Sequence, residues 1–162
     1  MTLSVLSIVR LHERCSLIVD TNILELLAVG ALDRSDVGRH CRTTEYSPAD
    51  FDLALEVVEH FERRAGVATT PHILAETSGL LGRSSELRLA PAKFIRTAGE
   101  LSAAAESIVR ERSYIKLGFT DAAIMRVTSA GCCVLTADWA LAAQLEQERK
   151  RVLNFNHLRF PV

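Results

Sequence analysis

Residues 16–24 read Ser-Leu-Ile-Val-Asp-Thr-Asn-Ile-Leu, and this stretch decides the fold class. The run from Leu17 to Val19 is short, continuous and apolar, which is typical of a strand buried on both faces of a sheet. The Asp-Thr-Asn that follows consists of three good helix N-cap residues, and Gly30 allows the helix to stop. A buried strand that passes directly into a helix is typical of a parallel α/β sheet.

The same alternation continues to the end of the chain. Further strands are expected at residues 67–70, 132–136 and 151–155. Helices are expected over residues 51–65, from 71 to about 82, from about 120 to 130, and from 139 to about 148. Strands that alternate with helices predict an α/β fold with a parallel sheet of four to five strands.

The segment between residues 83 and 118 is expected to be helical, with a break near Pro91. Its apolar residues follow a 4-3-4-3 spacing: Phe94, Ala98, Leu101, Ala105 and Ile108. This spacing predicts one helix that packs a single face against the rest of the domain.

Length and composition favour one soluble globular domain over residues 1–162. Hydrophobic residues make up 48% of the chain and charged residues 24%, and the net charge of −1 indicates no strongly basic surface, while a local basic groove around an acidic site stays open. The four cysteines lack metal-binding spacing, which favours a reducing cytoplasm. The apolar start from Leu3 to Val9 lacks a basic leader, so we expect neither a signal peptide nor a membrane span.

Two segments stand outside the alternating pattern. Residues 1–15 form an N-terminal extension before the first strand, and residues 31–49 form a polar insert that we expect to be a loop or partly ordered. The insert carries Arg34, Arg39 and Arg42, which would contact RNA or a partner or simply lie in a solvated loop.

Four acidic residues occupy positions where strands end or helices begin. Asp20 and Asp138 end apolar runs, and Glu76 and Asp121 lie in helical segments that follow a strand or a tight glycine turn. Because the carboxyl ends of parallel strands face one crevice, these carboxylates would meet there and repel one another unless a divalent cation held them. Without Cys or His ligands, the ion expected is Mg²⁺ or Mn²⁺, whose chemistry suits a phosphodiester substrate.

Each acid also has a structural explanation. Asp20 and Asp138 are good helix caps, and Asp121 follows Thr120, a natural N-cap. Glu76 lies at the margin of the stripe expected to be buried on its helix, and this position suits an acid that reaches into a crevice. That stripe consists of Ile73, Leu74, Leu80 and Leu81.

Short motifs around these acids resemble the PIN-domain family of toxin-like ribonucleases. The motifs are Ile-Val-Asp-Thr-Asn at 18–22, Thr-Pro-His-Ile-Leu-Ala-Glu at 70–76, Phe-Thr-Asp-Ala-Ala-Ile at 119–124, Val-Leu-Thr-Ala-Asp-Trp-Ala-Leu-Ala at 134–142, and the tail at 152–159. The resemblance spans residues 16–159. It implies a Rossmann-like, three-layer α/β/α sandwich around the parallel sheet.

The resemblance also implies a function, namely metal-dependent hydrolysis of single-stranded or structured RNA. The implied ligands of Mg²⁺ or Mn²⁺ are Asp20, Glu76, Asp121 and, directly or through water, Asp138. Asn22 and Thr136 would orient these acids. Many small members of the family are toxins, so an antitoxin protein and a homodimer are the partners expected besides RNA.

Two other functions stay open on the sequence. The same fold could hold RNA or a protein partner without hydrolysing anything, as a binding module. A haloacid-dehalogenase-like phosphatase also begins from an Asp after the first strand, but it needs a second Asp where this chain has Asn22. Four basic residues between the second and third acids are candidates for phosphate contacts: Arg83, Arg88, Lys93 and Lys116.

Overall fold

The fold is built on one all-parallel sheet of five strands, in the order β3-β2-β1-β4-β5. The computed structural model describes residues 3–82, 85–94 and 96–160. The strands are β1 (Ser16–Val19), β2 (Val67–Thr69), β3 (Gly99–Glu100), β4 (Cys132–Thr136) and β5 (Arg151–Asn154). The predicted parallel α/β sheet of four to five strands is confirmed.

Strand β1 lies at the centre of the sheet, between β2 and β4. Leu17 pairs with Val67 on one side, and Ile18 pairs with Val134 on the other. The apolar residues of β1 and every residue of β4 are buried. This burial on both faces explains why these strands read as continuous apolar runs instead of alternating ones.

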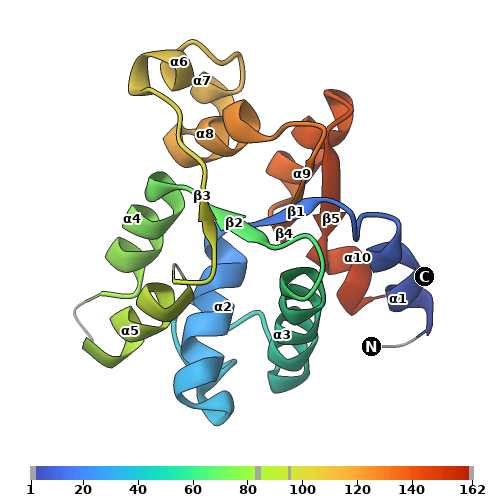
Figure 1. The fold of residues 1–162 in the computed structure, drawn as a ribbon. Coiled ribbons are helices and arrows are strands. Elements are labelled where there is room, and N and C mark those ends of the chain that lie inside the picture. The colour runs from blue at the N-terminus through green and yellow to red at the C-terminus, as the bar shows by residue number, and fades with distance from the viewer. Residues whose placement is uncertain (1–2, 83–84, 95, 161–162) are drawn as a thin grey trace.

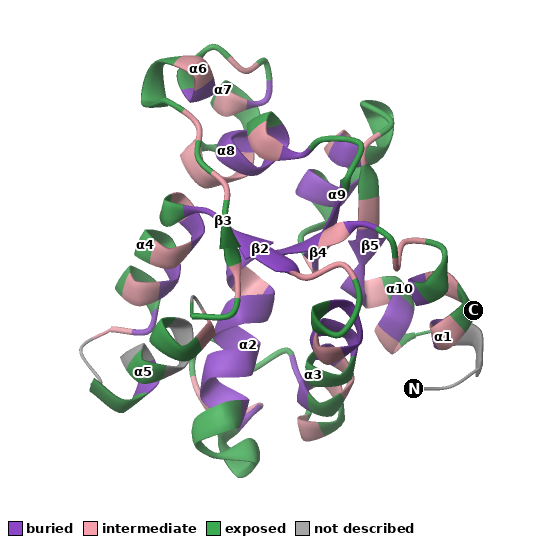
Figure 2. Cartoon of the chain, in the orientation of Figure 1, coloured by how far each residue is buried: buried purple, intermediate pink, exposed green. Residues whose placement is uncertain are grey.

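Helices cover both faces of the sheet and make the three layers. They are α1 (Leu3–Arg10), α2 (Thr21–Leu32), α3 (Pro48–Glu62), α4 (Pro71–Leu80), α5 (Ser85–Phe94), α6 (Ala105–Val109), α7 (Tyr114–Leu117), α8 (Phe119–Val127), α9 (Trp139–Gln147) and α10 (Phe155–Arg159). Figure 1 shows α2, α3 and α5 together on one side of the sheet and α8 and α9 on the other. Figure 2 shows that the central strands and the sheet-facing part of α2 are buried.

Local signals set several helix ends. Ser47 and Asp50 form a reciprocal capping box at the start of α3, and Pro48 occupies the first turn, where a missing N–H costs nothing. Pro71 plays the same part in α4. Gly66 turns the chain from α3 into β2 with a φ of 87°, a conformation that glycine adopts without steric cost.

The prediction of one helix from the spacing of Phe94 to Ile108 is wrong. Strand β3 interrupts it, because Gly99 pairs with Ala68 and Leu101 N donates to Thr69 O at 2.9 Å. Pairing with the open edge of β2 outweighs a helical pattern that contains a glycine. The break expected near Pro91 is also wrong, because α5 continues through that residue.

The two segments outside the pattern are both packed. In the N-terminal extension, α1 buries Val5 and Val9. In the expected insert, α2 continues two residues past Gly30, a short 3-10 helix follows at Arg34–Asp36, and Val37 and Tyr46 are buried. The helix therefore does not stop at Gly30, but apart from the 3-10 helix the chain runs through turns and bends up to α3, as expected of a loop or partly ordered insert.

The helices of the described residues are too short or too polar for a membrane span. In residues 3–82, 85–94 and 96–160, none of them combines the length and the apolar character needed to cross a bilayer. The longest, α3, has 15 residues and carries several charged side chains.

Candidate functional site

The four acids predicted from the sequence line one cavity at the carboxyl edge of the parallel strands. The cavity has a volume of about 460 Å³. Its acidic lining residues are Asp20, Glu25, Glu76, Asp121 and Asp138. The strands bring these side chains together because β1, β2 and β4 all point the same way, so their following segments meet at one edge.

Asp20 ends β1 and is the deepest of the four acids, with 3% of its surface exposed. Its Oδ1 accepts from the backbone N–H of Thr21 at 2.7 Å, and its Oδ2 accepts from the Thr136 hydroxyl at 2.6 Å. Burial raises the pKa of Asp20 to about 6, and the charges of Asp138 and Glu76 add to that rise. Asp20 is also the N-cap of α2, so the capping explanation is confirmed alongside its place in the cavity.

Asp121 lies in the first turn of α8. Burial is the main reason that the pKa of Asp121 is raised, and repulsion from Asp20, Asp138 and Glu76 contributes as well. Together they raise it to about 7. Thr120 is not the N-cap expected from the sequence: α8 begins one residue earlier, at Phe119. The charges of Glu76 and Asp138 therefore act on the pKa values of both Asp20 and Asp121.

Glu76 reaches the cavity from α4. Its Oε2 accepts from the Thr21 hydroxyl at 2.9 Å, so the helix that follows β1 holds the acid that follows β2. The buried stripe of α4 differs from the expected one, since Thr77 is fully buried and Leu80 is 38% exposed. Leu80 lines the cavity beside Glu76 instead of packing into the core.

Asp138 is the N-cap of α9. Its Oδ1 accepts from the backbone N–H groups of Ala140 at 2.6 Å and of Leu141 at 3.0 Å. The capping explanation is therefore confirmed for this acid too. Asp138 is exposed and nevertheless lines the cavity, so one side chain stabilises the helix start and adds charge to the site.

The two residues expected to orient the acids act in different ways. The Thr136 hydroxyl donates to Asp20 and accepts from the backbone N–H of Asp138 at 2.9 Å, so it links two of the acids directly. Asn22 Oδ1 accepts from Ala137 N at 3.2 Å. Asn22 thus fastens the β4–α9 turn to α2, and it positions the segment that carries Asp138 rather than a carboxylate.

The sequence reasoning missed an ion pair that forms part of the cavity wall. The side chain of Glu25 is 2% exposed, and both of its oxygens accept from the Arg42 guanidinium, at 3.0 and 3.1 Å. Burial raises the pKa of Glu25, and the hydrogen bonds from Arg42 oppose that rise. A signal existed, because Glu25 is the one charged residue in the apolar run at 23–29.

The donor set matches a hard divalent cation, because it consists of carboxylates without thiol or imidazole groups. A bound cation would also neutralise the repulsion that raises the pKa values of Asp20 and Asp121. Within the ranges that the structure describes, however, no three His, Cys, Asp or Glu side chains are placed as ligands of one ion. The acids share a cavity without forming a closed coordination shell.

The motifs that resemble the PIN-domain family meet in this cavity. Those that begin at Ile18, Thr70, Phe119 and Val134 each contribute one of the four acids to its wall. The family itself stays a prediction from these motifs. No family model, no curated protein and no solved structure matches the chain.

Proposed function

We propose that this protein is a metal-dependent endoribonuclease that hydrolyses phosphodiester bonds in RNA. The observation that carries the proposal is the convergence of Asp20, Glu76, Asp121 and Asp138 on one cavity. Uncompensated carboxylates destabilise a folded protein, and a site built from them favours a function that requires a cation. The raised pKa values of Asp20 and Asp121 support the same interpretation.

When bound, Mg²⁺ or Mn²⁺ supplies an activated water and neutralises charge on the scissile phosphate. The residues that would hold it are the four acids. Hydroxyl groups keep two of these acids in place, since Thr136 donates to Asp20 and Thr21 donates to Glu76. Such hydrogen bonds favour the charged carboxylate that a cation needs.

Basic groups near the cavity support an anionic substrate. Arg42 lines the cavity, and 40% of its side chain is exposed even though it pairs with Glu25. Lys116 is exposed in α7 and precedes Leu117, another lining residue. Arg42 is the candidate for a phosphate contact inside the cavity, and Lys116 is a candidate next to one of its lining residues.

The remaining basic candidates do not strengthen this site. Lys93 lines a different cavity, between α2, α3 and α5, and Arg34 pairs with Asp52 on the surface. Arg83 lies outside the described residues, and so does the side chain of Arg88.

A cleavage assay tests the proposal. The purified protein is incubated with end-labelled RNA in Mn²⁺, in Mg²⁺ and in EDTA, beside Asp20→Asn, Asp121→Asn and the control Glu146→Gln, an exposed acid on α9. We expect cleavage only with metal, and a loss of at least about a hundredfold in both Asn variants. Full activity in either folded Asn variant, or loss in the control, would contradict the assignment.

A second candidate is a binding module that holds RNA or protein without hydrolysis. It is favoured by the lack of a closed coordination shell among the described acids. Calorimetric titration with Mn²⁺ separates the two functions. A nuclease site should give heat of binding that Asp20→Asn removes, whereas a scaffold without a metal site gives none.

The proposal extends to a toxin that acts in the cytoplasm as a homodimer and is neutralised by an antitoxin protein. An apolar cavity of about 500 Å³ between α2, α3 and α5 supports a protein partner. Leu32, Leu55 and Leu89 line it and are exposed, and the acids Glu59 and Glu62 favour a partner segment with basic residues. Growth arrest on expression, absent in Asp20→Asn, would support the toxin role, and light scattering gives the oligomeric state.

A further inference from the structure

An exposed aromatic pair lies directly beside Asp138. Trp139 is the first residue of α9 and the only tryptophan in the chain, and 59% of its surface is exposed. Its ring meets the His157 ring of α10 at a centroid distance of 5.3 Å and an angle of 65°. This edge-on contact fixes the indole while most of its surface stays open to solvent.

The pair lies at the same edge of the sheet as the acidic cavity. Trp139 follows β4, and His157 follows β5, the parallel neighbour of β4. Asn156 Nδ2 donates to Ala137 O at 2.7 Å and ties the two segments together. Because the Asp138 cap fixes the start of α9, the indole is held in place one residue from an acid of the cavity.

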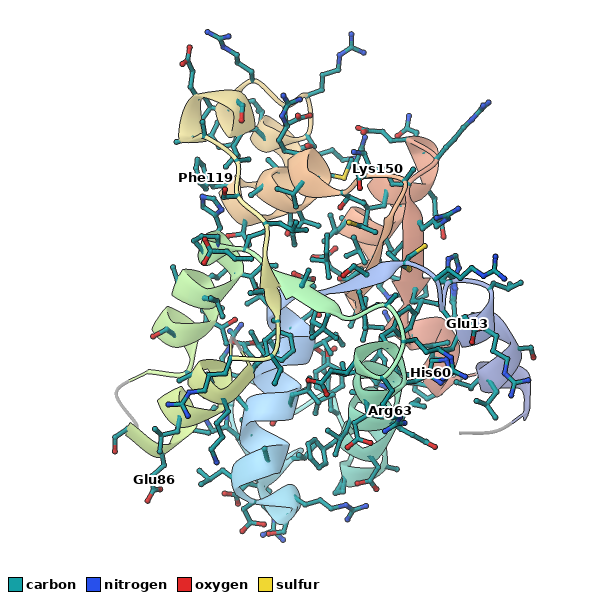
Figure 3. All side chains as sticks on the ribbon, viewed as in Figure 1. Glu13, His60, Arg63, Glu86, Phe119 and Lys150 are labelled. Carbon is teal, nitrogen blue, oxygen red and sulfur yellow. The ribbon has the colours of Figure 1, made fainter. Side chains whose placement is uncertain are left out.

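A second aromatic group borders the cavity on the side of α4 and α8. Phe119 lines the cavity and is labelled in Figure 3, where it lies at the start of α8 on the side facing α4. The centroid of its ring lies 5.1 Å from that of His72 and 6.2 Å from that of Tyr114. Phe119 therefore lines the cavity itself, whereas Trp139 follows the lining residue Asp138 directly in the chain.

We propose that Trp139, fixed by His157, is a stacking platform for a nucleobase next to the phosphate bound at the acidic cavity. The inference rests on the proposed function and names the residue on which a base of a single-stranded substrate would stack. Bases of a single strand are free to stack on exposed aromatic rings, whereas bases in a duplex are already stacked on each other. Five acids against the single arginine that lines the cavity make its attraction for phosphate depend mainly on a cation, so base stacking supplies affinity that the negative site lacks.

The single tryptophan allows a direct binding measurement. The wild-type protein, which keeps all four acids, is titrated in Mg²⁺ with a short single-stranded oligonucleotide whose phosphorothioate linkages resist hydrolysis, and with an abasic chain of equal length and the same linkages. With excitation selective for tryptophan over the two tyrosines, any change in fluorescence comes from Trp139. We expect quenching by the base-bearing strand and little change with the abasic chain; equal quenching by both, or none with either, overturns the platform.

Affinity is then compared by anisotropy of a labelled oligonucleotide. Trp139→Ala should bind roughly 5- to 150-fold more weakly, the range found when one stacking aromatic is removed. Trp139→Phe should keep most of the affinity. The matched control is Leu11→Ala, an exposed apolar residue at the opposite edge of the sheet, before β1. Unchanged affinity in Trp139→Ala contradicts the proposal.

Two further readouts separate this proposal from its alternatives. If Trp139→Ala converts a dimer into a monomer by light scattering, the pair is a contact between copies of the chain and the platform is wrong. Cleavage by the wild type is assayed in parallel. Quenching without any cleavage keeps the platform and refutes the nuclease, whereas cleavage that Trp139→Ala leaves unchanged refutes the platform alone.

Discussion

The Thr136 hydroxyl donates a 2.6 Å hydrogen bond to Asp20 Oδ2, and the two residues are 116 positions apart in the chain. The bond forms because Val19 and Leu135 pair in neighbouring strands, which places the next residues side by side. It holds a carboxylate that is almost completely buried. The contact therefore belongs both to the sheet and to the candidate site.

Removing that hydroxyl should destabilise the protein. Thr136→Val keeps the shape of the side chain but leaves a buried carboxylate oxygen of Asp20 without its donor, at a cost of about 1–3 kcal/mol. Urea denaturation at pH 8 measures the loss. Thr136→Ser, which keeps the hydroxyl, is the control and should lie within about 1 kcal/mol of the wild type; equal stability of Thr136→Val would refute the importance of the bond.

Without added metal, stability should fall as the pH rises from about 4 to about 7. The pKa values of Asp20 and Asp121 are raised to about 6 and about 7 in the folded state, from 3.8. The folded protein therefore binds more protons than the unfolded chain in this window, and the free energy of unfolding decreases as they are released. For Asp20 we expect a loss on the order of 3 kcal/mol.

The measurement is urea denaturation in EDTA across that pH range. Asp20→Asn removes one titrating carboxyl, so its profile should be flatter and its stability at pH 8 higher than that of the wild type. A profile that rises with pH would show that burial and the neighbouring charges do not raise the pKa values of Asp20 and Asp121 in the folded protein.

Divalent cations should reverse this trend. Mn²⁺ or Mg²⁺ competes with protons for the carboxylates, so each should raise the Tm more at pH 8 than at pH 5. At a concentration of 100 times Kd, the added stability is about 2.7 kcal/mol. Asp121→Asn should lose most of the shift in a thermal melt, and Glu146→Gln, outside the cavity, should keep it; an equal shift in both would point to nonspecific binding.

Breaking the Arg42–Glu25 pair should cost far more than breaking an exposed pair. Arg42→Ala leaves the buried Glu25 carboxylate without its bidentate partner, and we expect a loss of about 3 kcal/mol. Arg34→Ala breaks a pair with Asp52 of similar geometry on the surface and should cost less than about 1 kcal/mol. Glu25→Gln added to Arg42→Ala should restore part of the stability.

That comparison is made by denaturation at neutral pH. If the two Arg→Ala variants lose equal stability, burial of Glu25 is not what makes the pair important.

Two glycines in helices should respond in opposite directions to alanine. At Gly30 of α2, an added Cβ would lie 2.2 Å from the Phe51 ring of α3, so Gly30→Ala should destabilise by about 1–3 kcal/mol. At Gly79 of α4 nothing lies within 4 Å, and Gly79→Ala should stabilise by up to about 1 kcal/mol. Thermal melts of both variants test the packing of α2 against α3, and destabilisation of equal size would contradict it.

Much of the fold follows from local patterns. The apolar run at 17–19 and the caps that follow it specify a buried strand and a helix, because burial on both faces and N-cap hydrogen bonds depend on neighbouring residues. The same holds for β2, β4 and β5. The order of Asp20, Glu76, Asp121 and Asp138 along the chain was also enough to place them at one edge of a parallel sheet.

Other features are decided by residues far apart. Strand β3 exists because Gly99 pairs with Ala68. The local sequence around Gly99 has helical spacing and gives no sign of a strand, so only this long-range pairing decides its structure. Arg42, in the expected insert, lines the cavity because it pairs with Glu25. Glu25 itself is buried because it lies on the apolar face of α2.

The sequence by itself determined the parallel α/β class and the identity of the acids, since periodicity and capping are short-range. Only the tertiary structure decided how these acids interact. The pKa values of Asp20 and Asp121 depend on burial and on charges from other segments, as the repulsion of Asp121 by Asp20 shows. It also decided that Trp139 meets His157 beside them, because two parallel strands must pair before the residues that follow can touch.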